Sequence, residues 1–449
     1  MRSIIKHLVQ ARASVTILLL IVYFLEPLHI PVSFRNHASQ SLPPRRVFWT
    51  SDLHDGTRCD IATTLVAGLG QTLINGGHKR ERSIYAECLQ GVELPSRSLA
   101  PLIDTKKSHS DYVSEKDVQL FFEYYKRDPD IARTDAFVCA FPLSFCEAFL
   151  PFNRTVIYLA AHRYVLGRCH TEAQWLRLNK HLAEAAKFGN IVAAMGRFDA
   201  EYINYYTGLD PIILSTNSFW YASPPFTNYT GERAEILVGP LQRDAVPFAA
   251  ELQRVAKGRY SFTTTRQLYG RFESLQVVAR HRAAVMFPYA VLSYGITEMY
   301  AVGIPMFVPT VDFLVSLDTM GDWRALDGIN YCSSASRAFE PLRHPLSRHS
   351  VSPEANTRKA ALYWLRFADL YQWPHVQTFA SWDELLAKLD ATDFNAVHAN
   401  MLHENERRRE ELVGRWRGVI GKIETSRRVP ATYREALERV VRFDSVQGE

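Results

Sequence analysis

The segment Thr50–Thr57, which follows the first apolar run after residue 45, carries three titratable side chains within four positions. They are Asp52, His54 and Asp55, and a glycine follows them. A carboxylate or a neutral imidazole in such a loop can take a proton from a hydroxyl group, so Asp52 or His54 is a candidate general base. Asp and Gly are also common turn formers, and an ordinary turn is the alternative interpretation.

A second histidine, His162, follows the apolar run 156–161. This run predicts a buried strand, and open parallel sheets bind ligands at the carboxyl ends of their strands. An imidazole at such a position can hydrogen-bond a hydroxyl group or accept a proton near neutral pH. The competing interpretation of a lone histidine is a structural one, and the residues alone leave both open.

The most specific pattern lies in residues 283–308, where a strand, a loop, a helix and a second strand are predicted in turn. Backbone N–H groups at the start of such a helix bind phosphate. The residues predicted to do so are Ser293, Tyr294, Gly295 and Ile296. Glu298 is expected in the first helical turn, where its carboxylate can accept hydrogen bonds from two hydroxyl groups of a ribose. The alternative interpretation is a carboxylate that the helix dipole stabilises.

An earlier apolar run, 235–239, ends at Gly239, and Arg243 follows four residues later. A guanidinium group makes charge-assisted hydrogen bonds with phosphate, each worth about 1.5 to 3 kcal/mol. Gly239 and Arg243 are therefore predicted to contribute to the same anion site. A solvated loop arginine is the alternative for Arg243.

Short apolar runs alternate with helix-like segments in two series along the chain. The first series comprises 47–50, 61–74, 136–140, 156–160, 191–194 and 212–214, and the second comprises 235–239, 260–262, 284–287 and 305–308. Strands that alternate with helices predict parallel sheets, so the fold class is α/β with two halves. The turn-rich stretch 223–231 is the predicted break between them.

The first residues predict a membrane segment. Arg2, Lys6 and Arg12 precede the apolar run 15–25, whose insertion into a bilayer is worth roughly −3 to −6 kcal/mol. An uncleaved anchor is favoured over a cleaved signal peptide, which would look similar. The predicted segments are a cytoplasmic tail (1–12), a signal-anchor helix (13–32), a stem (33–45), a first domain (46–230), a second domain (231–390) and a helical tail (391–449).

Three further features bear on compartment and partners. The sequons at Asn153 and Asn228 are predicted glycosylation sites on the lumenal side of a membrane. Six cysteines permit fifteen complete disulfide pairings, with buried free thiols as the alternative, and their spacing predicts no metal site. A net charge of +5 over 449 residues is too small to indicate a nucleic-acid partner.

The string 283–308 resembles the donor-binding signature of GT-B-fold glycosyltransferases, in particular the retaining, family 4-like branch. That branch has a Glu-x7-Glu loop followed by Ala-x-x-Gly-x-Pro. The matching positions here are Glu298, Ala301, Gly303 and Pro305. Ala290 stands where the first Glu of the pair is expected, and Pro240 replaces an Arg that often follows the phosphate-loop glycine.

This resemblance implies two Rossmann-like domains that face each other across a cleft. The second domain would bind a nucleotide-sugar through Gly239, Arg243 and the loop before Glu298. His162 would contact the transferred sugar, and Asp52 or His54 the acceptor, which is a glycan, protein or lipid. Transfer would need no metal or other cofactor. With the anchor, the resemblance predicts a single-pass type II protein of the Golgi or endoplasmic reticulum membrane, with its catalytic part in the lumen.

Two other function classes stay open. The departures at Ala290 and Pro240 suit a non-catalytic relative that binds a glycan or a partner protein through the same architecture. A glycan hydrolase or an epimerase on a related two-domain scaffold is the weaker alternative. The sugar, the nucleotide, the acceptor and the stereochemistry of transfer are not predicted.

Overall fold

The computed structural model describes residues 43–50, 52, 54–76, 86–97, 113–141, 143–161, 171–215, 218–239, 245–269, 274–288, 290–318, 342–355, 357–425 and 427–441. The chain divides into two units, 1–42 and 43–449, and all described residues belong to the second. The predicted signal-anchor helix, 13–32, therefore lies outside them. Within the described residues, no helix has both the length and the apolar character needed to cross a membrane.

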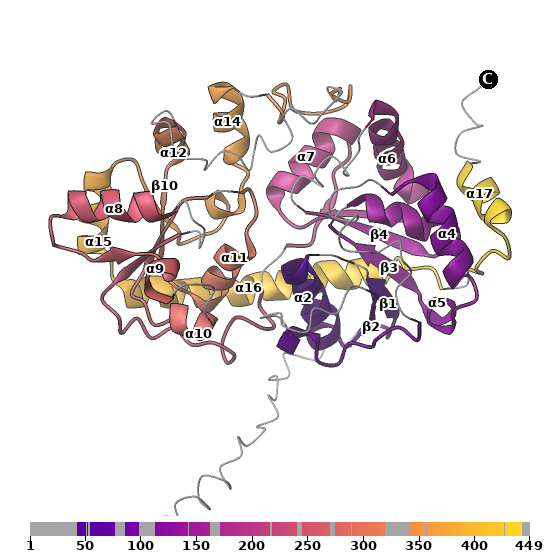
Figure 1. Ribbon diagram of the computed structural model, residues 1–449, viewed down its shortest axis with the longest axis horizontal. Coiled ribbons are helices and arrows are strands. Elements are labelled where there is room, and N and C mark those ends of the chain that lie inside the picture. The colour runs from indigo at the N-terminus through magenta and orange to yellow at the C-terminus, as the bar shows by residue number, and fades with distance from the viewer. Residues whose placement is uncertain are drawn as a thin grey trace, which may run out of the picture. The chain divides into compact units, whose positions relative to one another are not determined.

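The first sheet has six strands in the order β2-β1-β3-β4-β5-β6, and every neighbouring pair is parallel (Figure 1). Its strands are β1 (Val47–Thr50), β2 (Thr72–Asn75), β3 (Ala136–Cys139), β4 (Thr155–Ala160), β5 (Ile191–Ala194) and β6 (Ile212–Ile213). Strands β2, β3 and β4 are buried along their whole length, as expected for a parallel sheet that helices cover on both faces. We call residues 43–215 the N-terminal lobe.

The connections of the N-terminal lobe are mainly helical. They are α2 (Asp55–Thr63), the π-helical turn η1 (Thr64–Gly68), α4 (Glu115–Tyr125), α5 (Pro129–Arg133), α6 (Glu172–Glu184) and α7 (Arg197–Thr207), with the short 3-10 segments η2 (Ala86–Leu89), η4 (Leu143–Phe152) and η6 (Ala185–Phe188). Several helices begin with a side-chain cap. In α4 and α6, Ser114 and Thr171 form capping boxes with Asp117 and Gln174, which satisfy otherwise unpaired backbone N–H groups.

The second sheet has five parallel strands in the order β11-β10-β9-β7-β8. Its strands are β7 (Ile236–Gly239), β8 (Phe262–Thr263), β9 (Ala284–Met286), β10 (Met306–Pro309) and β11 (Gln377–Phe379). Its helical segments are α8 (Ala245–Ala256), α9 (Thr265–Tyr269), α10 (Leu275–Val278), α11 (Tyr294–Val302), α12 (Val311–Asp318), α14 (Arg358–Leu365), η8 (Asp369–Tyr371) and α15 (Trp382–Ala391). We call residues 236–391 the C-terminal lobe. The prediction of an α/β fold with two parallel sheets is confirmed.

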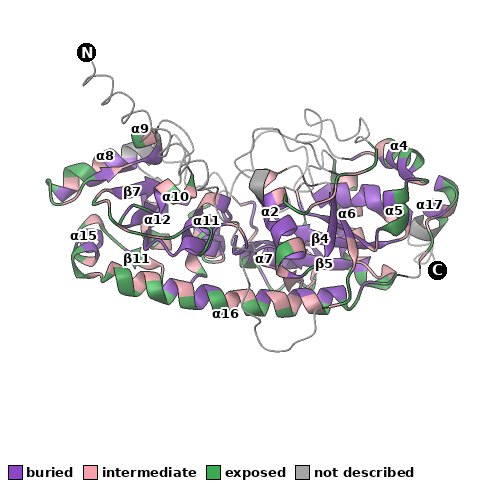
Figure 2. Ribbon diagram, turned by 90° about the horizontal axis from the view of Figure 1, so that it is seen from below, coloured by how far each residue is buried: buried purple, intermediate pink, exposed green. Residues whose placement is uncertain are grey.

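Helix α16 (Phe394–Ile420) packs against both lobes (Figure 2). Its first half contacts α11, where Asn405 Nδ2 donates to the carbonyl oxygen of Ala301 at 3.2 Å. Its second half buries Trp416 and Ile420 in the same apolar cluster as Phe48 of β1. Helix α17 (Tyr433–Val441) then packs on α4 and η4 of the N-terminal lobe. The last part of the chain thus ties the two sheets together.

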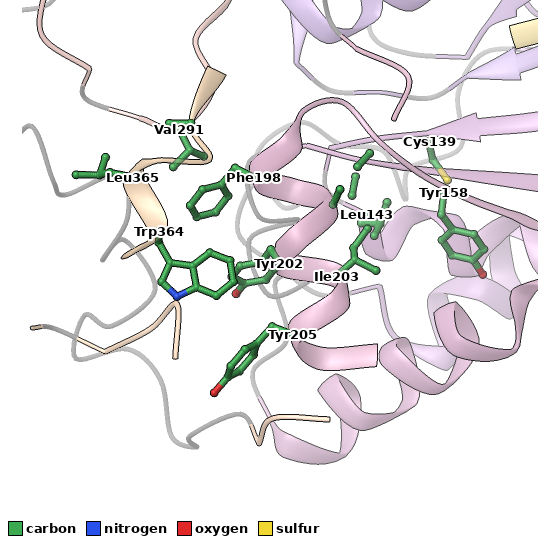
Figure 3. Packing of buried hydrophobic residues seen from close by; sticks show 14 of the residues in the cluster. Cys139, Leu143, Tyr158, Phe198, Tyr202, Ile203, Tyr205, Val291, Trp364 and Leu365 are labelled. Carbon is green, nitrogen blue, oxygen red and sulfur yellow. The ribbon is translucent and has the colours of Figure 1, made fainter. Parts of the chain in front are cut away.

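Aromatic side chains also pack between the lobes (Figure 3). Trp364 of α14 is fully buried, with its ring centroid 5.6 Å from that of Phe198 and 6.1 Å from that of Tyr205, both on α7. Burial of a large aromatic side chain stabilises a fold by several kcal/mol, so this contact favours the observed placement of α14 on α7.

Four of the six cysteines form two disulfides, Cys59–Cys88 and Cys139–Cys146. The first joins α2 to η2, and the second joins the end of β3 to η4. Cys169 and Cys332 lie outside the described residues. For the four described cysteines, the structure selects disulfides over free thiols, as is usual in an oxidising compartment.

We expect peptide mapping of the unreduced protein, with free thiols alkylated beforehand, to recover one peptide pair linked through Cys59 and Cys88. Reduction should separate that pair, because the two cysteines are 29 residues apart in the sequence. Recovery of alkylated Cys59 and Cys88 from the unreduced sample would contradict this pairing.

Candidate functional site

The predicted loop after β1 lies at the point where the strand order of the first sheet reverses. Strand β1 pairs with β2 on one side and β3 on the other, so the crossover connections leave in opposite directions. The carboxyl ends of strands at such a reversal are where open α/β sheets bind ligands. Asp52 joins the two loops there. Its Oδ1 accepts a hydrogen bond from the backbone N–H of His54 at 2.9 Å, and its Oδ2 one from Phe141 at 2.8 Å.

The second sheet has the corresponding reversal between β7 and β9. Gly239 ends β7 opposite Met286 of β9, and its carbonyl oxygen accepts the N–H of Phe287 at 2.7 Å. The chain then leads to α11, whose N-cap residue is Ser293. The structure therefore brings Gly239 and the predicted anion-binding loop to the same edge of the sheet.

The two predicted loops also contact each other, through Tyr294 at the start of α11. The Tyr294 ring is stacked on His54 with a centroid distance of 5.4 Å and an interplanar angle of 26°. Its hydroxyl group donates to Met195 Sδ at 3.4 Å. Tyr294 is buried, so its side chain holds α11 against the N-terminal lobe. In the first turn of α11, the N–H of Ile296 donates to the carbonyl oxygen of Ser293 at 3.1 Å, so this predicted phosphate donor already has a partner.

His54 is the N-cap of α2. Its Nδ1 accepts a hydrogen bond from the backbone N–H of Thr57 at 3.4 Å. A neutral imidazole that accepts at Nδ1 carries its proton on Nε2. In this arrangement Nε2–H is a donor. Proton uptake at Nε2 requires the other tautomer, with the hydrogen on Nδ1, and that tautomer gives up the helix cap. The general-base role of His54 stays a prediction.

Two properties of Asp52 support different roles for its carboxyl group. Burial raises the pKa of Asp52 to about 7, in spite of hydrogen bonds from the backbone N–H groups of His54 and Phe141, which lower it. A carboxyl pKa near 7 suits a general base. However, Asp52 is only 2% exposed and both oxygens are bonded to backbone. The geometry therefore fits a residue that positions the His54 loop at least as well as one that takes a proton.

Glu298 lies further along α11 than the sequence predicted. The helix begins at Tyr294, two residues before the predicted start, and its first turn contains no acidic residue. Glu298 Oε1 accepts a hydrogen bond from Tyr221 OH at 3.0 Å, and that hydroxyl lies 2.9 Å from Ser218 Oγ. Tyr221 and Ser218 lie before the C-terminal lobe in the chain. Glu298 therefore has a structural partner from a distant segment, which the sequence did not reveal. Its ribose contact stays a prediction.

The small residues after Glu298 have a structural explanation. Gly303 ends α11 with φ = 80°, a left-handed conformation that favours glycine, and a Cβ there would lie 2.6 Å from His398 Nδ1 on α16. Ala301 is fully buried under α16, and Pro305 leads into β10. These positions let α16 pack on α11, so the ligand-binding significance of the motif depends mainly on Glu298.

The remaining predicted residues divide into described and undescribed ones. His162 and Arg243 lie outside the described residues, as does Pro240. Gly295 is half-buried and Ile296 buried, both within α11. Across the described residues, no group of three or more His, Cys, Asp or Glu side chains is arranged to hold a metal ion.

The two sequons differ in accessibility. Asn228 is exposed, as an acceptor of a glycan must be. Asn153 is half-buried, and its Nδ2 donates to the carbonyl oxygen of Arg428 at 3.0 Å. The folded protein thus presents Asn228 more openly than Asn153.

Gly56 is a site residue that the sequence analysis did not single out. A Cβ at this position would lie 2.6 Å from Cγ of the buried Tyr294 ring. Gly56→Ala should therefore lower the free energy of unfolding by about 1 to 3 kcal/mol and weaken ligand binding, because α11 must shift. Gly414→Ala is the matched control, since no atom lies within 4 Å of a Cβ there. Chemical denaturation measures the stability of both variants. Equal stabilities would show that the Tyr294 ring does not need the space beside Gly56.

Comparisons with known proteins give only distant likenesses. No protein-family model and no curated protein matches the chain. Among solved structures, it is similar to the glycotransferase of kitacinnamycin (13% identity, 89% of this chain and 100% of that chain, TM-score 0.38) and to the glycosyltransferase SnogD from Streptomyces nogalater (13%, 84% and 100%, 0.41). It is also similar to the glycosyltransferase VinC in complex with dTDP (9%, 89% and 99%, 0.35). Likenesses at this level assign neither a family nor an activity.

Proposed function

We propose that this chain is a glycosyltransferase of the GT-B type, which moves a sugar from a nucleotide-sugar to a glycan, protein or lipid acceptor. The observation that carries the proposal is the meeting of two switch points. Each lobe has a parallel sheet whose strand order reverses at the predicted ligand loop, and Tyr294 of one loop stacks on His54 of the other. A ligand held at one loop is thereby placed beside the other.

In this proposal the C-terminal lobe holds the donor. Backbone N–H groups at the start of α11, together with Gly239 and Arg243, bind the diphosphate, and Glu298 binds the ribose. Stabilisation of the leaving diphosphate by these fixed donors supplies the main catalytic effect, and no metal is invoked.

The N-terminal lobe holds the acceptor and the transferred sugar. His54, oriented by Thr57 and Tyr294, contacts the acceptor hydroxyl, and Asp52 fixes the loop or takes the proton. His162 contacts the sugar.

The proposed location is the lumen of the Golgi or endoplasmic reticulum, with residues 13–32 as a single-pass anchor. The two disulfides and the exposed sequon at Asn228 support a lumenal environment.

A turnover screen tests the activity. Purified full-length protein is incubated with a panel of nucleotide-sugars and a mixture of glycan and lipid acceptors, and released nucleoside diphosphate is measured. We expect one donor to be consumed in an acceptor-dependent reaction. If no donor is consumed with any acceptor, or if release is the same without acceptor, transferase activity is contradicted.

A second candidate function is non-catalytic binding on the same architecture. Ala290 and Pro240 depart from the donor motif, and the buried Tyr294 ring occupies space between the two loops. A protein of this kind would bind a glycan or a partner protein without consuming any nucleotide-sugar, which the same screen distinguishes.

A further inference from the structure

A cavity of about 240 Å³ lies between three segments: the turn from β5 to α7, residues 369–374, and helix α16. None of the residues predicted to bind the donor lines it. The wall is partly apolar, through Met195, Trp373 and Leu412. Its charged residues are four arginines and three acidic residues: Arg197, Arg407, Arg408, Arg415, Asp369, Glu404 and Glu411. This site therefore does not depend on the proposed sugar transfer.

Arg408 is the arginine that distinguishes this cavity. Its neighbours on α16, Arg407 and Arg409, form ion pairs with Glu404 and Glu406 at 2.6 and 2.9 Å. For Arg408, by contrast, no carboxylate oxygen of a described residue lies within ion-pair distance.

The surroundings of Arg408 are mainly aromatic. Its guanidinium carbon lies 5.3 Å from the ring centroid of Tyr300 and 5.5 Å from that of Trp373. Burial lowers the pKa of Arg408, although the phenol of Tyr300 and nearby carboxyl groups act against this. Arg408 is half-buried, and cation–π contacts stabilise a guanidinium group only partly, so this cation still favours a negative partner.

Asp369, a candidate partner that lines the same cavity, is a poor one at neutral pH. It is buried, and a Cβ on Gly196 would lie 2.6 Å from its Oδ1. Burial, reinforced by the charge of Asp199 on α7, raises the pKa of Asp369 to about 8, while Arg408 acts in the other direction. Asp369 is then mostly protonated at pH 7. Glu404 and Glu411, the acidic residues of α16 that line the cavity, are both paired with Arg407.

We propose that this cavity binds a tetrahedral oxyanion, a phosphate or sulfate group that is either free or carried on a sugar, against the Arg408 guanidinium. Gly196 and Arg197, at the start of α7, also line the cavity. The first turn of α7 already carries the carboxylate of Asp199, so the group that attracts the anion is the Arg408 guanidinium.

The first test is isothermal titration calorimetry of the full-length protein with inorganic sulfate, at constant ionic strength maintained with sodium chloride. We expect saturable binding to the parent, weakened about tenfold or more in Arg408→Gln and unchanged in Arg409→Gln. Glucose 6-sulfate is a parallel probe, and tighter binding of this ester than of inorganic sulfate identifies a sugar-borne anion. The absence of saturable binding with both probes, or equal affinity in Arg408→Gln and the parent, would overturn the proposal.

A second arm does not depend on whether Arg408→Gln folds. The charge of sulfate is constant between pH 7 and 9, whereas Asp369 loses its proton over this range and then repels the anion. Affinity of the parent should therefore fall from pH 7 to pH 9, and affinity of Asp369→Asn should stay level. A level profile in the parent, or the same decline in both proteins, would contradict the placement of the anion beside Asp369.

Discussion

Replacing His54 with Asn should lower kcat/KM for sugar transfer by about 10²- to 10⁴-fold, the usual contribution of a positioned acid–base side chain. Stability should change little, because Asn is among the best N-cap residues and can replace the bond from His54 Nδ1 to the N–H of Thr57. The variant thus separates the imidazole's part in the reaction from its part in starting α2. Initial rates and chemical denaturation of the same preparation measure the two effects.

His375→Asn is the matched control for this variant. His375 is exposed and has φ = 65°, a conformation that Asn tolerates, so neither activity nor stability should change. If His54→Asn transferred sugar as fast as the parent, the loop after β1 would not belong to the reacting site.

Replacing Glu201 with Ala should lower the free energy of unfolding by about 3 to 5 kcal/mol, the usual cost of removing one partner from a buried ion pair. Glu201 lies on α7 of the N-terminal lobe and is 1% exposed. Its Oε2 lies 2.8 Å from His349 Nε2 and accepts a hydrogen bond from Arg348 Nε at 2.7 Å, and both partners belong to the C-terminal lobe. The substitution leaves His349 buried without its carboxylate and removes a tie between the lobes.

Asp210→Ala is the control, because Asp210 pairs with the same Arg348 but its side chain is 76% exposed. An exposed pair contributes little, so the loss should stay below about 1 kcal/mol. Chemical denaturation of the three proteins at pH 7 measures the difference. If both variants were destabilised equally, burial of Glu201 would not be the source of the effect.

The contribution of Glu201 should also depend on pH. Burial alone raises the pKa of Glu201, but hydrogen bonds from His349 and Arg348 outweigh it and lower the pKa to about 2. A carboxyl group with a lowered pKa stabilises the fold fully above its ordinary pKa of 4.5 and loses that contribution as pH falls toward 2. The stability gap between the parent and Glu201→Ala should therefore narrow below about pH 4.5. A gap that stayed constant down to pH 3 would contradict this.

Much of the fold follows from local patterns in the sequence. The apolar runs at 136–140, 156–160 and 284–287 match β3, β4 and β9 to within one residue at either end, because buried parallel strands are apolar on both faces. The run 61–74 was less clear, since it covers the end of α2, a π-helical turn and most of β2. Strand β11 was missed because it is short and half-exposed, with no continuous apolar run.

The candidate site was predictable only in part. The sequence placed Asp52, His54, Gly239 and Ser293 at the carboxyl ends of predicted strands. Such a placement depends only on the order of the elements along the chain. Contacts between distant segments could not be predicted, because they leave no local pattern in the sequence. Examples are the hydrogen bond of Asp52 with Phe141, 89 residues away, and that of Glu298 with Tyr221, 77 residues away. The same holds for the space that Gly56 leaves for Tyr294.

In the proposed function, the start of α11 and the end of β7 together seat a nucleotide. The affinity of the full-length protein for a panel of nucleoside diphosphates, measured by titration calorimetry, tests it most directly. We predict saturable binding of one nucleotide, weakened about tenfold or more in a folded Glu298→Ala protein and unchanged when exposed Glu424 is replaced by Ala. No binding of any nucleotide, or equal binding by Glu298→Ala and the parent, would contradict it.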